Sequence, residues 1–332
     1  MAIVRHRVVP LLAPHAAALG LPDVQQHRLH EMHLGVAGAG LANAAHTDAA
    51  SAVLADAGVD HLVVKGAVLP PLVGQTPASR GPGDIDVWVR PDAWADAERA
   101  LGAAGWSRRD GTADLPVPGD GWRGRVVQRV GMEMPLDHPR RSTVDLHWRL
   151  VPDHREVRFG FDEALARSVP VPEVGPTVRT LCPVDALDHI AQHGRKEHWP
   201  VLRQLVDVAD LAAACGDELD GLVRTSPNAR VALATAAHVD ARLSDLPGID
   251  RRARRLADEA WAGCLSLRWP LSTLWSATGL ERVRVRARRE SWDLRSAPSA
   301  SVAAAHVGRA LVPVRLLTDP HPLRHRRHRT KG

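Results

Sequence analysis

One stretch of the sequence constrains the fold more than any other: LVVKGAVLPPLVGQTPASRGPGDIDVWVR, residues 62–90. It opens with an apolar run at residues 62–64, which is typical of a short buried strand. A loop rich in Pro, Gly and Ser follows, and residues 84–89 then begin with alternating polar and apolar side chains. Because side chains alternate along a strand, Asp84 and Asp86 are predicted to lie on one face.

Two carboxylates side by side on a strand repel each other, so a protein gains from them mainly when a cation neutralises both. Mg²⁺ takes oxygen ligands of this kind. A third acidic residue shows the same pattern, because alternation in residues 142–148 (STVDLHW) puts Asp145 and His147 on one face of a second predicted strand. If the two strands are neighbours, three carboxylates converge, the usual minimum for holding one or two Mg²⁺ ions against a nucleoside triphosphate (NTP).

Other residues near the first aspartate pair suit the binding of phosphate. Lys65 and Gly66 stand where the first strand would end, and Arg80 lies in the loop that follows. Lys65 and Arg80 are predicted to contact phosphate oxygens, and Gly66 would let the backbone approach them closely. His147 is predicted either to accept the proton of an attacking hydroxyl or to orient Asp145 by a hydrogen bond.

The remaining pattern indicates an α+β protein, a mixed sheet covered by helices and followed by a helical C-terminal domain. With 332 residues and 45% hydrophobic residues, the chain is long enough for one large domain or two. The expected order begins with a helix at 23–58, whose last part (48–57) ends at Gly58, and continues with a strand, a short helix and a second strand. The segments expected after them are a helix at 93–104; a loop at 106–124; antiparallel strands at 125–130 and 142–148; and helices at 183–193, 200–214 and within 218–318.

Four segments are therefore expected. They are an N-terminal helical segment (1–45), a catalytic core (46–180), a helical domain (181–318) and a basic disordered tail (319–332). The tail contributes much of the net charge of +5. A solvated end is the favoured interpretation of the tail, and contact with nucleic acid is the less favoured one.

The ordered motifs resemble the polymerase-β-like nucleotidyltransferase superfamily, and within it the bacterial family of uncharacterised nucleotidyltransferases. The resemblance rests on Lys65-Gly66, Arg80, Asp84-Ile85-Asp86-Val87-Trp88-Val89 and Val144-Asp145-Leu146-His147-Trp148, and further on His193, Trp199, Leu202-Arg203 and Asp207. It covers roughly residues 45–215, and four motifs agree in order and in local pattern. One departure is Ala67, because the superfamily has Gly or Ser after the glycine that corresponds to Gly66.

The resemblance implies a minimal nucleotidyltransferase core whose cleft is closed by a helical partner domain. It implies Asp84 and Asp86 as metal ligands, Asp145 as the third carboxylate, and His193 as a substrate contact. The expected activity is Mg²⁺-dependent transfer of a nucleotidyl group from an NTP, ATP included, to a small molecule, a peptide or a protein.

Several alternatives stay open at the level of sequence. The chain could be a catalytically inactive module that binds nucleotide or nucleic acid, or the toxin component of a toxin–antitoxin pair. His189 and His193 share a helix face and permit a zinc pair, although no Glu accompanies them as in zinc proteases. Arg203 and Asp207 are most simply a helix-surface ion pair. Three widely spaced cysteines and the absence of an 18-residue apolar run predict a cytoplasmic protein without a membrane partner.

Overall fold

The computed structural model describes residues 2–151, 153–265 and 279–311. Its centre is a five-stranded mixed sheet with strand order β1-β2-β5-β4-β3. The strands are β1 (His61–Val64), β2 (Ile85–Val89), β3 (Ser107–Arg108), β4 (Glu133–His138) and β5 (Arg141–His147). β2 and β5 run parallel, whereas the other neighbouring pairs are antiparallel. The predicted α+β class with a mixed sheet is confirmed.

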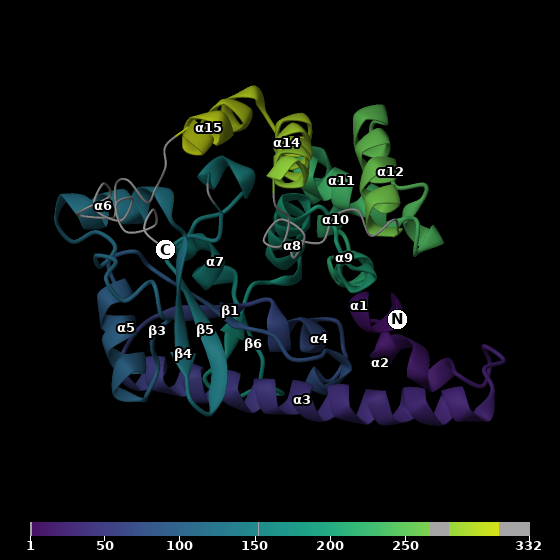
Figure 1. Ribbon diagram of the computed structural model, residues 1–332, viewed down its shortest axis with the longest axis horizontal. Helices are drawn as coiled ribbons and strands as arrows, with labels where there is room; N and C mark the ends of the chain where they lie inside the picture. Colours follow the sequence, from purple (N-terminus) through teal and green to yellow (C-terminus); the bar gives the residue numbers. More distant parts are fainter. Residues whose placement is uncertain (1, 152, 266–278, 312–332) are drawn as a thin grey trace.

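Helices surround this sheet and continue beyond it (Figure 1). Before and between the strands lie α1 (Ala2–Arg5), α2 (Val9–Leu12), α3 (Asp23–Asp56), α4 (Leu69–Leu72), α5 (Trp94–Ala103) and α6 (Gly121–Val130). After the sheet come α7 (Phe161–Arg167), a ribbon of β6 (Val169–Pro170) and β7 (Arg179–Thr180), and then α8 (Pro183–Glu197), α9 (Leu202–Ala214), α10 (Glu218–Thr225), α11 (Pro227–Ala236), α12 (Arg251–Leu265), α14 (Gly279–Ser296) and α15 (Ala300–Leu311). The predicted helical C-terminal region is therefore present.

α3 is a single helix of 34 residues that runs along one side of the molecule, at the bottom of Figure 1. The helix expected at 23–58 is confirmed, and it is continuous because no proline or cap interrupts it at residue 48. It stops where expected: Ala57 is its C-cap and Gly58 follows with a φ of 68°. α3 also crosses residue 45, so the expected boundary between an N-terminal segment and the core falls inside one helix.

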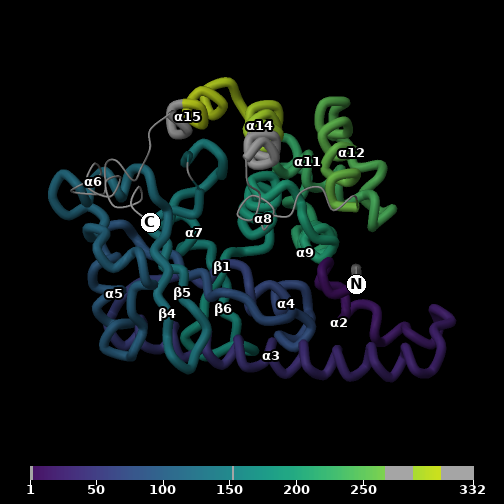
Figure 2. Tube along the Cα trace, viewed as in Figure 1, coloured from purple at the N-terminus to yellow at the C-terminus, as the bar shows by residue number. Residues whose placement is uncertain are grey.

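The two faces of the sheet are buried by different helices, as alternation along β2 requires. Ile85, Val87 and Val89 share a hydrophobic cluster with the C-terminal part of α3 and with α5. Trp88, from the other face, shares a second cluster with residues of α7, α8 and α9. Figure 2 shows the C-terminal helices gathered beside the sheet. Asp86 lies on the same face of β2 as Trp88, so it points to the side covered by the helical region.

The strand expected at residues 125–130 is wrong, because this segment belongs to helix α6. Its valines are β-branched and suggested a strand, but Val127 alone among them is buried, on a helix that packs against the sheet. The antiparallel neighbour of β5 is instead β4. The expected loop at 106–124 also contains β3 and the start of α6.

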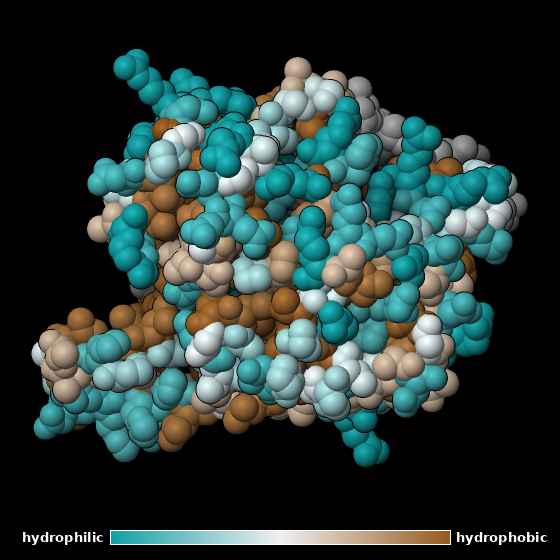
Figure 3. Space-filling view, turned by 180° about the vertical axis from the view of Figure 1, so that it is seen from behind, coloured by the Kyte–Doolittle hydropathy of each residue, from teal (hydrophilic) through white to brown (hydrophobic). Residues whose placement is uncertain are grey.

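The first nineteen residues of α3, 23–41, include apolar side chains that are exposed to solvent. Val24, Leu34 and Leu41 are each more than half exposed. Figure 3, seen from behind, shows this end of the molecule as a ledge at the lower left with hydrophobic patches. Apolar residues therefore lie all around the helix, which explains why their spacing in the sequence mixes three- and four-residue steps.

Parts of the prediction fall outside the described residues, including the basic tail at 319–332. Within the described part of the chain, no helix combines the length and the apolar character needed to span a bilayer. The three cysteines are free thiols.

α3 meets the loop between β1 and β2 at Gly40, which gives a test of the fold. A Cβ at Gly40 would come within 2.8 Å of the carbonyl oxygen of Pro77 and also strike that of Arg80. We therefore expect Gly40→Ala to lower the free energy of unfolding by about 1–3 kcal/mol. Gly38→Ala, on the same helix with open space around it, is the control and should raise it by up to about 1 kcal/mol. Urea denaturation measures both; equal effects would contradict the close approach.

Candidate active site

The predicted neighbours in the sheet bring two of the three aspartates together. In the parallel register of β2 and β5, Asp86 lies opposite Asp145, and Trp88 lies opposite His147. Asp84 stands immediately before β2, exposed at the edge of the same face. The strand pairing inferred from the sequence is therefore confirmed.

α3 fixes the beginnings of these two strands. The side-chain amide of Asn43 donates one hydrogen bond to the carbonyl oxygen of Gly83, at 2.7 Å, and another to Ser142 Oγ, at 3.0 Å. His46 Nδ1 lies 3.1 Å from the same Ser142 oxygen. One helix thus holds the residue before Asp84 and the start of β5 in a common register.

Lys65 contacts the central carboxylate of the site. Val64 pairs with Asp86 across β1 and β2, so the next residue leaves β1 beside this aspartate. Lys65 Nζ lies 2.9 Å from Asp86 Oδ1, and both side chains are at most 15% exposed. Burial opposes the charge of Lys65, but the carboxylate of Asp86 outweighs it and raises the pKa of Lys65. Lys65 has a φ of 64° and Gly66 one of 58°. A lysine in this region is strained, which is common where function requires a fixed geometry.

His147 lies between two carboxylates. Its Nε2 is 3.1 Å from Asp86 Oδ1, and its Nδ1 is 3.1 Å from Glu133 Oε2 of β4. Burial alone would raise the pKa of Asp86, but Lys65 and His147 outweigh it and hold that pKa far below its usual value. Because both ring nitrogens face carboxylates, His147 is placed to orient Asp86 and less suited to remove a proton from a substrate.

The other two aspartates lie in surroundings that disfavour their charged forms. Burial, and then the charges of Asp86, Glu133 and Asp84, raise the pKa of Asp145 to about 6. Partial burial and the charge of Asp86 also raise the pKa of Asp84. A divalent cation would relieve this repulsion, and its preferred oxygen ligands are present. Among the described residues, however, no set of three or more acidic, His or Cys side chains is already arranged as metal ligands.

α8 supplies the opposite side of the site. Both ring nitrogens of His189 are buried without a hydrogen-bond partner. Burial, and next the charge of Lys65, keep the pKa of His189 well below its usual value, so this ring is neutral. His193 Nε2 lies 3.2 Å from Glu197 Oε1, and burial together with the charge of Lys65 lowers the pKa of His193 as well. A zinc site built on the two histidines has no third ligand among the described side chains.

Arg80 ties the loop before β2 to the helical region. Its Nη1 lies 2.5 Å from Asp207 Oδ2, and Arg203 Nε donates to Asp207 Oδ1 at 2.9 Å. The Arg203 and Asp207 side chains are about 95% buried. The expectation of a surface ion pair is therefore wrong, because α9 packs this face against the core. Arg203 also donates to the carbonyl oxygen of Ser79, at 3.1 Å, in the same loop.

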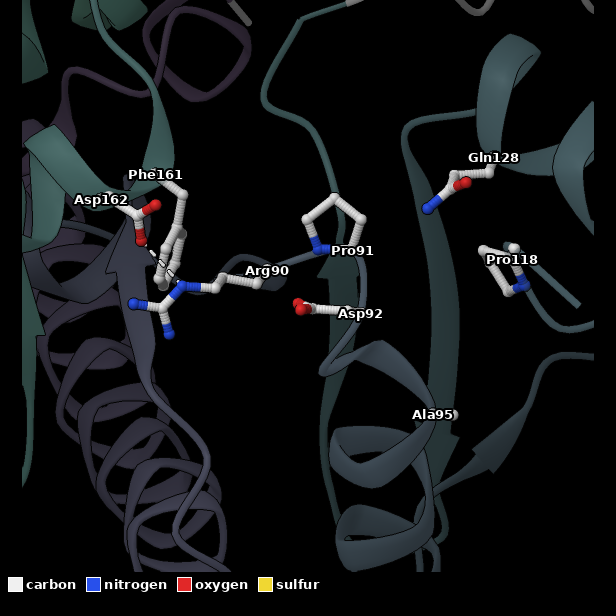
Figure 4. A pocket seen from close by; sticks show the side chains of 9 residues that line it. Arg90, Pro91, Asp92, Ala95, Pro118, Gln128, Phe161 and Asp162 are labelled. Carbon is white, nitrogen blue, oxygen red and sulfur yellow. Dashed lines mark hydrogen bonds and ion pairs between the residues drawn. The ribbon is translucent and has the colours of Figure 1, made fainter.

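A cavity of about 650 Å³ lies elsewhere, beyond the carboxyl end of β2. Figure 4 shows Arg90 and Asp92 on one side of it and Gln128 on the other. Arg90 is already held by Asp162, at 2.7 Å, and by Asp60, at 2.8 Å. Since the aspartate cluster lies at the opposite end of the strand, this cavity is separate from the candidate site.

Two residues of the site were not predicted from the sequence, Glu133 and Glu197. Glu133 belongs to β4, whose residues 132–137 alternate in a way that would have revealed a strand, but Pro135 argues against one. Glu197 lies four residues after His193, a spacing that does place both on one helix face. Burial would raise the pKa of Glu197, but His193 outweighs it and lowers that pKa to about 2.

The raised pKa of Asp145 predicts a dependence of stability on pH in the absence of divalent metal. The ordinary pKa is 3.8 and the folded value about 6. The folded state therefore keeps a proton that the unfolded state has lost, and stability falls as the pH rises through this range. As the pH rises from 4 to 6.5, the free energy of unfolding of Asp145→Asn should increase by roughly 2 kcal/mol relative to that of wild type. Urea denaturation in EDTA measures this, with the exposed Asp96→Asn as control; parallel curves for wild type and Asp145→Asn would contradict the prediction.

Because the ion pairs of Asp207 are buried, removal of its charge should strongly lower the stability of the fold. Asp207→Asn leaves Arg203 and Arg80 without a counter-charge and should lower the free energy of unfolding by about 3–5 kcal/mol. Asp96→Asn breaks the exposed pair with Arg99 and should change it hardly at all. Chemical denaturation of both variants provides the comparison, and similar small losses would show that the pair is not buried in solution.

The comparison with known protein families agrees with this geometry. A family model described as "Uncharacterised nucleotidyltransferase" matches residues 1–238, which include the sheet, α8 and α9. No curated protein and no solved structure is significantly similar to the chain. The family match covers well over half of the chain, so the protein belongs to the family of uncharacterised nucleotidyltransferases, whose general chemistry is nucleotidyl transfer from an NTP.

Proposed function

We propose that this protein is a Mg²⁺-dependent enzyme that transfers a nucleotidyl group from an NTP to a hydroxyl group of a small molecule, a peptide or a protein. The observation that carries the proposal is the position of Asp86 directly opposite Asp145, with Asp84 at the same edge. Burial and the neighbouring carboxylates together raise the pKa of Asp145, and a bound cation would offset both effects. A cluster of three aspartates of this kind is what the resemblance to the polymerase-β-like superfamily implies.

Asp84, Asp86 and Asp145 are the residues that would hold the metal. When bound, Mg²⁺ would supply charge neutralisation at the phosphates and align the attacking and leaving oxygens. His147 would keep Asp86 in a fixed orientation from its place between Asp86 and Glu133.

The transfer itself requires a base and a site for phosphate. The acceptor oxygen forms a bond to the α-phosphorus, the bond from that phosphorus to the bridging oxygen breaks, and pyrophosphate leaves. The hydroxyl proton passes to the carboxylate of Asp145. The transition state is charged on its phosphoryl oxygens, so nearby cations stabilise it.

Lys65, Gly66 and Arg80 are proposed to bind the phosphates. The positive φ at Gly66 opens the turn to close approach, and a Cβ there would still leave 3.4 Å to the carbonyl oxygen of Asp84. Arg80 uses one nitrogen for Asp207, and a guanidinium has further N–H groups for an anion. His193, partly exposed on α8, is proposed to contact the substrate from the helical side.

The test is transfer of label from each of the four α-³²P NTPs, with Mg²⁺ and cell extract as the source of acceptor. Asp86→Asn should lower transfer to about one hundredth of wild type or less, because a ligand is lost from the metal. Asp96→Asn, an exposed aspartate outside the site, should transfer label like wild type. Circular dichroism confirms that each variant is folded. Undiminished transfer by folded Asp86→Asn would rule out this metal site.

A binding module without catalysis is the second candidate. It is favoured by the contact of Lys65 with Asp86, which already provides a counter-charge, and by Ala67 in place of a hydroxyl residue. Calorimetry with NTP distinguishes the two: binding that is the same with and without Mg²⁺ supports the module, and binding that requires Mg²⁺ supports the enzyme.

A further inference from the structure

We propose that Lys65 is a built-in counter-ion that occupies Asp86 until a divalent cation binds, and that it is then released to the phosphates of the nucleotide. This inference rests on the proposed function, since it concerns the same metal site. It assigns to one residue two successive partners, a carboxylate before metal binding and an anion after it.

The first observation is that metal and lysine compete for the same oxygen. Lys65 Nζ lies 2.9 Å from Asp86 Oδ1, which His147 Nε2 also approaches to 3.1 Å. An oxygen in contact with two cationic or donor groups has little room for a metal ion at 2.0–2.1 Å, about the distance that Mg²⁺ requires. The ammonium must therefore move before Asp86 Oδ1 can serve as a ligand.

The second observation is the balance of charge. An ammonium brings one positive charge to a cluster in which Asp86 lies opposite Asp145, with Asp84 two residues before Asp86 and Glu133 on the neighbouring strand. A divalent cation brings two charges and contacts several oxygens at once. Leaving a buried carboxylate without any cation is strongly unfavourable. Lys65 is thus expected to leave Asp86 when a metal arrives and to stay there otherwise.

The third observation concerns the groups of α8 that face Lys65. The carboxylate of Glu197 attracts the charge of Lys65, and the ring of His189 has both nitrogens buried without a partner. A buried imidazole without a partner is costly and calls for a ligand or a water. An anion between β1 and α8 would give both Lys65 and His189 a partner.

The lysine content of the chain makes the test direct, because its lysines are Lys65, Lys196 and Lys331 alone. The wild-type protein is pulsed with an amine-acylating reagent and analysed by mass spectrometry in EDTA, in Mg²⁺, and in Mg²⁺ with a non-hydrolysable NTP analogue. Relative to Lys196, labelling of Lys65 should rise roughly tenfold or more on addition of Mg²⁺ and fall back when the analogue is added. Asp145→Asn should abolish the rise.

A thermal-shift measurement separates this inference from the proposed function. Lys65→Met should melt at a lower temperature than wild type in EDTA, and Mg²⁺ should raise its melting temperature more than that of wild type, because no ammonium has to be displaced. Arg167→Met removes a comparable partner from buried Asp185, at 2.9 Å, and should respond to Mg²⁺ like wild type. If Lys65→Met does not fold in EDTA, it is purified in Mg²⁺, and its loss of fold on chelation is the expected result.

The outcomes are distinct. A Mg²⁺-induced shift in wild type with no change in the labelling of Lys65 overturns the release of Lys65 and leaves the metal site standing. A rise in labelling that the NTP analogue does not reverse overturns the transfer to phosphate. No Mg²⁺-induced shift in wild type and in Lys65→Met alike removes the metal site and, with it, the proposed function.

Discussion

The parallel pairing of β2 with β5 is the constraint on which the rest of the site depends. It sets Asp86 opposite Asp145, and like charges at that spacing oppose the pairing. Burial of apolar side chains offsets this repulsion on the other face of the same strands, where Ile85, Val87 and Leu146 are almost completely buried. Packing on one face therefore holds together carboxylates that would separate in solution. Such a local conflict between charge and fold is expected at a functional site.

The helical region is part of the site as well as a cover for the sheet. Lys65 acts electrostatically on residues of α8, and the loop that carries Arg80 is anchored to Asp207 of α9. The aspartates thus face helices that follow the sheet in the sequence. A ligand in this site would touch both parts of the chain, and the order of the loop before β2 depends on α9.

The sequence was most informative where alternation and burial coincide. The strands predicted at 62–64, 84–89 and 142–148 are present within one residue at each end, since each buries one face or both. Residues 125–130 were assigned wrongly, because β-branched residues are common in strands but also tolerated in a helix that packs on a core. β4 was missed because Pro135 interrupts a pattern that otherwise alternates. Because β4 was not predicted, Glu133 on this strand was not identified as a site residue, and no motif indicates it.

The sequence by itself determined which chemical groups are present and which of them share a face, because the periods of strand and helix are local properties. It placed Asp84 with Asp86, and Asp145 with His147. Only the tertiary structure decided which groups meet: Lys65 with Asp86, His147 with Glu133, and Arg80 with Asp207. It also decided that Arg203 and Asp207 are buried and not at the surface. The physical reason is that spacing along the chain fixes direction, whereas ion-pair partners and burial depend on what packs against each face.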